Sequence, residues 1–324
     1  MVTIFTIWIA ILPVITWHNR YEVPKVSWLL AGGLLALLYL LINFKKIIFN
    51  KKDYFYLGWL LILLISSLLS ENVKLAILGG SYRHQGVVFF FCLWVLNKVV
   101  SLFNKKEKDS LYRGIGLTVI AEAILVLVGH RLGTLGDINA VSGFIAIGIY
   151  FTFNYLPKWL SIIPIFAFLY NFSKSATLSL APYLFKKINI IFILLVLIAS
   201  FIIKPIDNTS LFENREVIWK HSISLIADRP IIGYGAESNE KIFKKAFSES
   251  GFPLVNLIID RTHNLFLDIT IWSGIIGLIL FLSFLFHSFN ETEKKLKNVF
   301  IAFLIYSMFQ PLSVAHWILL MIII

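Results

Sequence analysis

The chain has 324 residues, of which 58% are hydrophobic and 15% are charged, and its formal net charge is +11. A soluble domain of this length cannot bury so much apolar surface, whereas a bilayer accepts it, so the composition indicates an integral membrane protein. The single cysteine, Cys92, excludes an intrachain disulfide and a cysteine-based zinc site.

Apolar segments separated by charged residues predict an all-α protein with about ten to twelve transmembrane helices. The first segment has neither a basic n-region nor a small-residue cleavage site, so we interpret it as a retained span rather than a signal peptide. The predicted spans lie near residues 2–17, 26–43, 54–69, 86–103, 114–129, 140–156, 159–171, 175–185, 188–203, 264–287, 298–309 and 315–324.

The distribution of Lys and Arg predicts the orientation of these spans. Short loops rich in Lys and Arg stay in the cytoplasm. Most of these residues fall in the alternate loops near 45–52, 105–113, 158, 186–187 and 294–297, which places both termini in the cytoplasm of a cell (inner) membrane protein. The opposite short loops hold Arg20, Lys25, Lys74, Arg83, Arg131 and Lys174. Topology therefore accounts for most of the positive charge, and we expect no nucleic-acid partner.

One long loop, residues 204–262, is predicted on the outer side. It separates N-terminal transmembrane helices (1–203) from C-terminal ones (263–324) within one membrane domain. Its stretch NREVIWKHSISLIAD (Asn214–Asp228) has apolar residues, including Ile223, at helical spacing, which predicts an amphipathic helix that ends before Pro230. A turn at Gly233 and Gly235 and a second, polar helix near 238–248 follow.

Ionisable residues at the mouth of a span are costly, and they therefore indicate a functional site. His263 and Asn264 open the tenth span, with Asp268 one turn further along. In the first turn of a helix, the dipole favours a neutral imidazole that can accept a proton. Five cations share the predicted outer side, and arginine side chains bind two phosphate oxygens at once. These cations are Arg83, Arg131, Lys174, Arg215 and Arg261.

Simpler interpretations remain open at this point. Arg83, Arg131 and Lys174 can extend to the membrane interface, and Arg215 can anchor its helix to lipid phosphates. Thr262 or His263 can begin the helix without any chemical role. Glu122, inside the fifth span, can form a structural pair with one of the cations.

The run NREVIWKHSISLIADRPIIGYGAES, followed by THNLFLDITIWSGIIGLILFL, resembles the O-antigen ligase and O-antigen polymerase superfamily. The matching residues are Arg215, Trp219, Pro230, Gly233, Gly235, His263, Asn264, Leu267, Gly274 and Gly277. The stretches GGSYRHQG, GTLGDIN and SKSATLSL are also similar, so the resemblance extends over most of residues 75–290. The sequence departs from the family pattern at Lys174, where arginine is usual, and at Asp137, where asparagine is usual.

The resemblance implies a membrane glycosyltransferase of surface polysaccharide biosynthesis, such as that of lipopolysaccharide. It would move a glycan from polyprenyl (undecaprenyl) diphosphate to a hydroxyl of a glycan, lipid-linked or protein acceptor on the outer face, without a metal or cofactor. His263 and Arg215 would be catalytic. The residues that would bind the diphosphate or glycan are Arg83, Arg131, Lys174, Trp219, Arg261 and Asn264.

Two other functions are possible. A polymerase of the same superfamily would extend the glycan rather than transfer it to a final acceptor. A membrane transporter belongs to another class, but transporters usually carry polar sites near the bilayer midplane and internal repeats. Here the polar residues lie at a helix mouth, and no repeat is visible.

Overall fold

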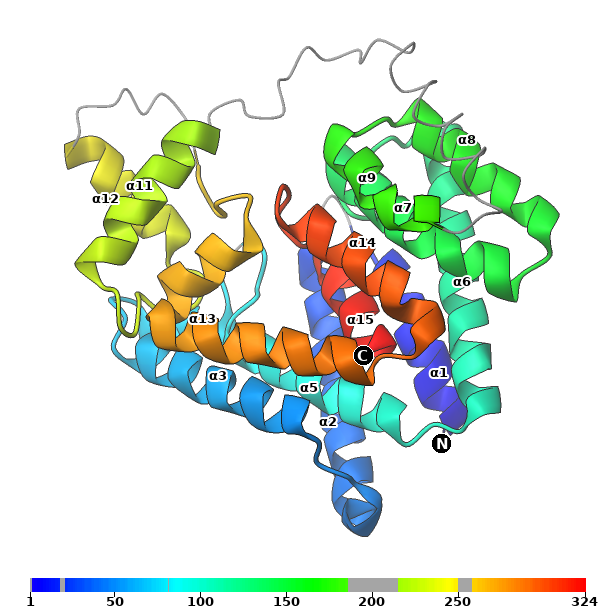
Figure 1. Ribbon diagram of the computed structural model, residues 1–324, viewed down its shortest axis with the longest axis horizontal. Coiled ribbons are helices and arrows are strands. Elements are labelled where there is room, and N and C mark those ends of the chain that lie inside the picture. The colour runs from blue at the N-terminus through cyan, green and yellow to red at the C-terminus, as the bar shows by residue number, and fades with distance from the viewer. Residues whose placement is uncertain (1, 18–20, 81, 186–214, 250–257) are drawn as a thin grey trace. The chain divides into compact units, whose positions relative to one another are not determined.

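The computed structural model describes residues 2–17, 21–80, 82–185, 215–249 and 258–324. Within these ranges the regular elements are all helices, which confirms the predicted all-α fold (Figure 1). The predicted span at 188–203 and the first part of the predicted outer loop, 204–214, lie outside the described residues.

Four of the described helices are long and apolar enough to cross a membrane, and four shorter apolar helices accompany them. The four long helices are α2 (Glu22–Ile42), α6 (Lys105–Leu127), α7 (Ile138–Tyr155) and α13 (Leu265–Glu291). The protein is therefore a membrane protein. The total number of spans, their orientation and the three-part division of the chain stay predictions.

The chain divides into two compact units, and the boundaries cut across its order in sequence. Unit 1 comprises residues 1–47, 95–211 and 292–324, and unit 2 comprises residues 48–94 and 212–291. The second boundary between them, after Trp94, falls within α5 (Val87–Ser101). Besides α2, α6 and α7, unit 1 contains α1 (Val2–Ile11), α8 (Ile162–Tyr170), α9 (Lys174–Ser179), α14 (Lys297–Ser307) and α15 (Val314–Ile323). Besides α13, unit 2 contains α3 (Lys51–Leu68), α4 (Val73–Leu78), α11 (Arg215–Asp228) and α12 (Asn239–Glu249).

Polar side chains define where several helices begin. Asn104 and Glu107 form a reciprocal capping box at the start of α6, with bonds of 3.1 and 2.7 Å. Asp137 caps α7 by accepting the Ala140 N–H at 2.8 Å. This gives a physical reason why Asp137 fits where the family usually has asparagine, because both residues cap helices well.

Buried charges in unit 1 are bound mainly to the backbone. Lys25 was expected in a loop, but it lies inside α2 and is fully buried; its Nζ donates to the Tyr21 and Thr134 carbonyls at 2.8 and 2.5 Å. Glu122 accepts the Thr134 N–H at 3.0 Å and the Thr134 hydroxyl, which identifies Thr134 as its hydrogen-bond partner. Glu22 accepts the Val314 N–H at 2.9 Å, linking α2 to α15. Such bonds satisfy buried polar groups that would otherwise be costly.

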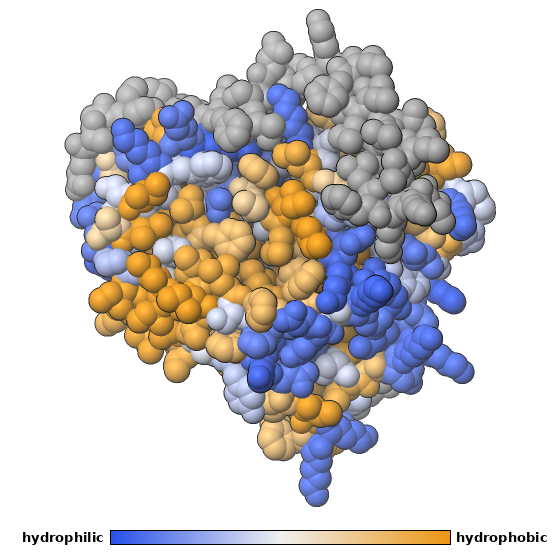
Figure 2. All heavy atoms as spheres, in the orientation of Figure 1, coloured by the Kyte–Doolittle hydropathy of each residue, from blue (hydrophilic) through white to orange (hydrophobic). Residues whose placement is uncertain are grey.

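The core of unit 2 is the packing of α3 against α13 (Figure 1). Trp59 and Phe281 pack with ring centroids 5.0 Å apart, and the Trp59 indole also donates to the Ser273 hydroxyl at 3.2 Å. Figure 2 shows apolar side chains gathered over these two helices, and Ile276, Ile279 and Phe286 are among those exposed. An exposed apolar face of this kind is expected where lipid covers the protein.

The helix α13 breaks at Gly274, whose φ of 65° and ψ of −172° are not helical. A break inside a membrane helix needs other groups to satisfy the freed backbone, and a neighbouring turn supplies them. This turn (residues 230–236, the glycine turn) donates from the Tyr234 and Gly235 N–H groups to the carbonyls of Ile271 and Trp272, at 2.8 and 3.0 Å. The Ile275 N–H in return donates to the Pro230 carbonyl at 2.8 Å.

Glycine is required on both sides of this contact. Gly233 and Gly235 have φ of 69° and 91°. A Cβ at Gly233 would lie 2.4 Å from the Ile271 carbonyl oxygen, and one at Gly274 would lie 2.1 Å from that of Ile231. The turn predicted from the sequence is therefore a close backbone contact with a broken helix, which only residues without a side chain allow.

Candidate functional site

The predicted site residues fall in both units. Arg131 and Lys174 belong to unit 1. The remaining ones belong to unit 2: Arg83, Arg215, Trp219, Gly233, Gly235, Arg261, His263 and Asn264. Unit 2 therefore contains the candidate site that the structure describes most fully.

His263 lies in a turn that precedes α13 (residues 258–264, the histidine turn). Its φ of 60° places it in the left-handed region, which is uncommon for a residue with a side chain. The helix itself begins at Leu265, and Asn264 caps it by accepting the Phe266 and Leu267 N–H groups at 3.0 and 3.2 Å. The expectation that His263 lies in the first helical turn is therefore wrong, and neither His263 nor Thr262 is the cap.

Asp268 holds the backbone of the histidine turn in place through a hydrogen bond. Its Oδ1 accepts the Thr262 N–H at 2.9 Å and the Asn239 side-chain amide at 2.8 Å. Asn239 in turn accepts the Trp272 indole N–H. Because Asp268 and Asn239 are buried, these bonds form in a setting where lost partners are costly. Asp268 thus fixes the backbone directly before His263.

The helix α11 brings Arg215 toward the same turn. The Trp219 indole N–H donates to the Thr262 carbonyl at 2.9 Å, and Arg215 lies one turn before Trp219 on α11. Helix α11 confirms the predicted helix, with Ile218 and Leu225 buried, but Ile223 is 64% exposed, so its apolar face is narrower than predicted. Helix α11 and the histidine turn are therefore linked by a direct bond, one helical turn after Arg215.

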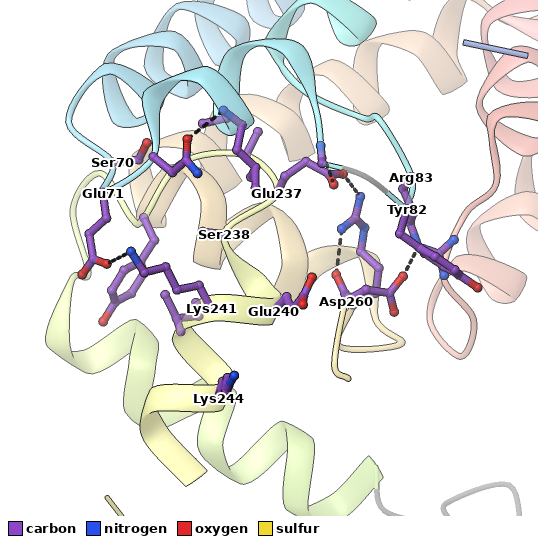
Figure 3. A pocket seen from close by; sticks show the side chains of 18 of the residues that line it. Ser70, Glu71, Tyr82, Arg83, Glu237, Ser238, Glu240, Lys241, Lys244 and Asp260 are labelled. Atoms are coloured by element: carbon purple, nitrogen blue, oxygen red, sulfur yellow. Dashed lines mark hydrogen bonds and ion pairs between the residues drawn. The ribbon is translucent and has the colours of Figure 1, made fainter. Parts of the chain in front are cut away.

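Arg83 and Arg261 are each bound to a carboxylate of unit 2 (Figure 3). Arg83 pairs with Asp260, and Arg261 pairs with Glu237. Arg261 is buried, donates to the Asp260 carbonyl at 2.7 Å, and stacks on Trp272 with its Cζ 4.7 Å from the ring centroid. Its guanidinium thus connects the histidine turn to Glu237, which directly follows the glycine turn, and to α13.

The pKa of Asp260 reflects this environment. Burial alone would raise it, but Arg83 and Arg261 beside the carboxyl together hold the pKa below its ordinary value. Asp260 therefore stays ionised at neutral pH, and its charge offsets that of Arg83.

Glu237 organises the segment that carries Arg83. Its carboxylate accepts the N–H groups of Gly80 and Gln85, both at 3.2 Å, in addition to pairing with Arg261. The residue has a φ of 57°, so Glu237, like His263 and His84, is a non-glycine residue in the left-handed region. Glu237 was not singled out in the sequence. The available signal was its position directly after the glycine turn, in the connection between α11 and α12.

The predicted cations of unit 1, Arg131 and Lys174, lie beside Asn171 and Ser173 respectively. Arg131 donates from Nε to the Asn171 amide oxygen at 3.2 Å, and its Cζ lies 5.7 Å from the centroid of the Tyr170 ring. Asn171 returns a bond to the Arg131 carbonyl at 2.6 Å. Lys174 begins α9 directly after Ser173, which donates to Asn139 at 2.7 Å. Arg131 therefore differs from Arg83 and Arg261: its side-chain bond is to an uncharged amide, whereas theirs are to carboxylates.

Metal-binding side chains do not gather in the part of the chain that the structure describes: no three His, Cys, Asp or Glu residues there are placed to hold one ion. The polar groups of unit 2 instead form bonds among themselves and around the histidine turn. This arrangement suits a site that binds polar ligands through hydrogen bonds and charge.

The fold and the site define the class of the protein. It is an all-α membrane protein with a polar turn, bearing a histidine, at the mouth of a broken helix. Residues 59–282 match the family model described as O-antigen ligase, and the chain belongs to that family. The match includes both turns, α11, α12 and α13 as far as Leu282. No curated protein matches the chain. Membership indicates a membrane enzyme of the glycosyltransferase kind, acting as an O-antigen ligase or polymerase in the broad sense.

Proposed function

We propose that the protein transfers a glycan from a polyprenyl diphosphate to an acceptor hydroxyl, at a site around His263 on the outer face of the cell membrane. The observation that carries the proposal is the bond from Trp219 to the Thr262 carbonyl. It connects the helix that bears Arg215 to the turn that bears His263, so the two proposed catalytic residues belong to one local assembly.

The proposed chemistry needs one base and one stabilised leaving group. The imidazole of His263 accepts the proton of the acceptor hydroxyl while that oxygen bonds to the anomeric carbon of the donor sugar. The bond from the anomeric carbon to the diphosphate oxygen breaks, and the polyprenyl diphosphate leaves with the electron pair. Arg215 stabilises the charge that develops on it, because a guanidinium binds two phosphate oxygens at once.

The structure supports different roles for the other predicted residues. Asn264 caps α13, and Trp219 ties α11 to the histidine turn, so both position the site. Arg261, in its buried pair with Glu237, also acts as a positioning residue. Arg131 and Lys174 stay sequence-based predictions for diphosphate binding, as do the outward orientation of the site and its independence of metal ions.

The test is transfer by the purified full-length chain from a polyprenyl-diphosphate-linked oligosaccharide to an acceptor sugar, with and without EDTA. His263→Asn is the decisive variant, because asparagine tolerates a left-handed backbone but cannot act as this base. We expect its turnover to fall by roughly 10²- to 10⁴-fold with donor binding retained.

Normal turnover in His263→Asn would remove the catalytic assignment, and absence of transfer by the wild-type chain would refute the function itself. The product distinguishes the two reactions within the family. A single transferred block indicates a ligase, and a ladder of increasing length indicates a polymerase.

A further inference from the structure

Unit 2 contains a cavity of about 430 Å³ beside the histidine turn, and we propose that it binds a neutral sugar of the glycan, next to the sugar that reacts. The inference rests on the proposed function and adds to it a second, separate binding subsite. The cavity falls in the range of roughly 300–1,000 Å³ that is typical of small-molecule sites.

Three segments that are distant in sequence form the walls. The first runs from the end of α3 through α4 to Arg83, the second from Arg229 into α12, and the third is the pair Asp260 and Arg261. Figure 3 shows Glu71 and Lys241 at one end and Asp260 with Tyr82 at the other, with Glu240 between them. The pair of Arg261 and Glu237, which helps to hold the histidine turn, therefore also forms part of the cavity wall.

The charges of the lining indicate a neutral ligand. Three of its four carboxylates are paired with a cation of the same lining: Asp260 with Arg83, Glu237 with Arg261, and Glu71 with Lys241 at 2.6 Å. The fourth acid, Glu240, lines the cavity together with two further cations, Arg229 and Lys244. A site for diphosphate would need a clear excess of positive charge, and here the charges nearly cancel.

Side chains of both hydrogen-bonding types reach the cavity, as a sugar requires. A sugar hydroxyl both donates and accepts, so it is bound best where carboxylates and cationic donors alternate. The carboxylate of Glu240 can accept and the ammonium of Lys244 can donate, and both residues are exposed on α12. The buried ion pair of Arg261 and Glu237 keeps part of the cavity wall rigid. A rigid wall lowers the entropic cost of binding the sugar.

Aromatic rings supply the apolar contact that the C–H face of a sugar ring needs. Tyr82 is 66% exposed although it lines the cavity, and a large exposed aromatic side chain is a common recognition element. Tyr234 lines the same cavity, and the Arg229 guanidinium lies 4.7 Å from the centroid of its ring. Polar groups along the walls and aromatic rings at the margin together suit a polyhydroxylated ring.

The position of the cavity relates it to the reaction. Asp260 lines it, and His263 follows three residues later, so their Cα atoms are at most about 11 Å apart. The cavity is therefore within reach of a sugar that neighbours one bound at His263. Binding there would hold the glycan in register without touching the reacting bond.

The experiment measures sugar binding directly, by saturation-transfer NMR on the full chain carrying His263→Asn, so that no turnover interferes. The probes are maltose, lactose and N,N′-diacetylchitobiose, with inorganic diphosphate as the competing anion. Tyr82→Ala and Glu240→Gln alter the cavity. Tyr54→Ala is the matched control, because Tyr54 is 65% exposed in the same unit but does not line the cavity.

We expect at least one disaccharide to bind, Tyr82→Ala to weaken it about tenfold, and Glu240→Gln to weaken it roughly two- to tenfold. Tyr54→Ala should leave binding unchanged. Absence of disaccharide binding, equal binding in all three variants, or displacement of the sugar by diphosphate would overturn the subsite. Transfer activity in the wild-type chain without sugar binding would refute only this inference, and sugar binding without transfer would refute only the proposed function.

Discussion

Two turns of unit 2 pack against α13, and they are held there by different parts of the chain. The glycine turn is held by backbone groups, which donate to and accept from the broken stretch of α13 around Gly274. The histidine turn is held by side chains: Asp268 and Trp219 bond to Thr262, and Glu237 binds Arg261.

The difference shows how α13 supports both a rigid backbone contact and the turn that carries the proposed base. Backbone bonds at the glycine turn depend on no ionisable group, but they require that no Cβ intervenes. The side chains at the histidine turn allow a bulky residue to occupy a left-handed backbone, because they over-determine its position, but they make that position dependent on charge. The proposed base thus lies on the turn whose geometry depends on charge.

Gly274→Ala should have the largest effect. A Cβ there would lie 2.1 Å from the Ile231 carbonyl oxygen, and the backbone conformation is one that essentially only glycine adopts, at a cost of about 1–3 kcal/mol for other residues before any overlap. We expect little folded protein in detergent, measured by size-exclusion yield and thermal unfolding. Gly58→Ala is the control, because a Cβ at this position in α3 meets Leu280 at an ordinary 3.6 Å. Equal loss in both variants would show that the contact between the glycine turn and α13 has no special importance.

Glu237→Ala should damage the histidine turn next most strongly. It leaves the buried Arg261 guanidinium without its carboxylate, and breaking such a pair typically costs about 3–5 kcal/mol. Thermal unfolding in the presence of detergent measures the loss. Glu122→Ala in unit 1 is the matched control: it also removes a buried carboxylate, but Lys25 keeps its two carbonyl bonds. We therefore expect a smaller loss there, and an equal one would contradict the distinction between charge pairs and backbone bonds.

Two substitutions of Asp268 test whether its carboxylate positions the histidine turn or takes part in proton transfer. Asp268→Ala removes the acceptor of both the Thr262 N–H and the Asn239 amide, so we expect kcat to fall by about tenfold to a hundredfold. Asp268→Asn keeps an oxygen at the same place and should stay within about threefold of wild type. If the two variants are equally inactive, the carboxylate takes part in proton transfer rather than in holding the turn.

The smallest effect concerns pH and Asp260. Its pKa is held below the ordinary value by Arg83 and Arg261 against the opposing effect of burial, so its ionised form is favoured in the folded state. The stabilisation is complete above the ordinary aspartate pKa of about 3.9 and is lost as the pH falls through the lowered value. The difference in unfolding temperature between wild type and Asp260→Asn should thus be constant from pH 7 to about 5 and shrink below pH 4. A difference in unfolding temperature that does not vary with pH would show that the ion pair of Asp260 and Arg83 adds nothing to the stability of the fold.

Local sequence patterns were enough to predict the class of the protein and most of its helices. The predicted amphipathic helix begins at Arg215, within one residue of the expected start, and the predicted tenth span begins at Leu265 rather than Asn264. Composition, helical periodicity and capping residues all act over a few turns of one helix, so they can be read without knowing the fold. The residues around His263 and Gly233 were singled out in the sequence as ionisable groups at a helix mouth, as turn glycines, and by their resemblance to the family.

The partners of the charged residues were decided by the tertiary structure alone. Arg83, which is predicted to bind the diphosphate or glycan, pairs with Asp260, 177 residues away, and Glu122 bonds to Thr134. The same is true of the break in α13, which is stable because the glycine turn supplies the missing bonds. Sequence spacing indicates which side chains carry charge. Which of them meet depends on packing between distant segments, and that packing determines whether the charge of a cation is balanced by a carboxylate of the protein or is left to attract a ligand.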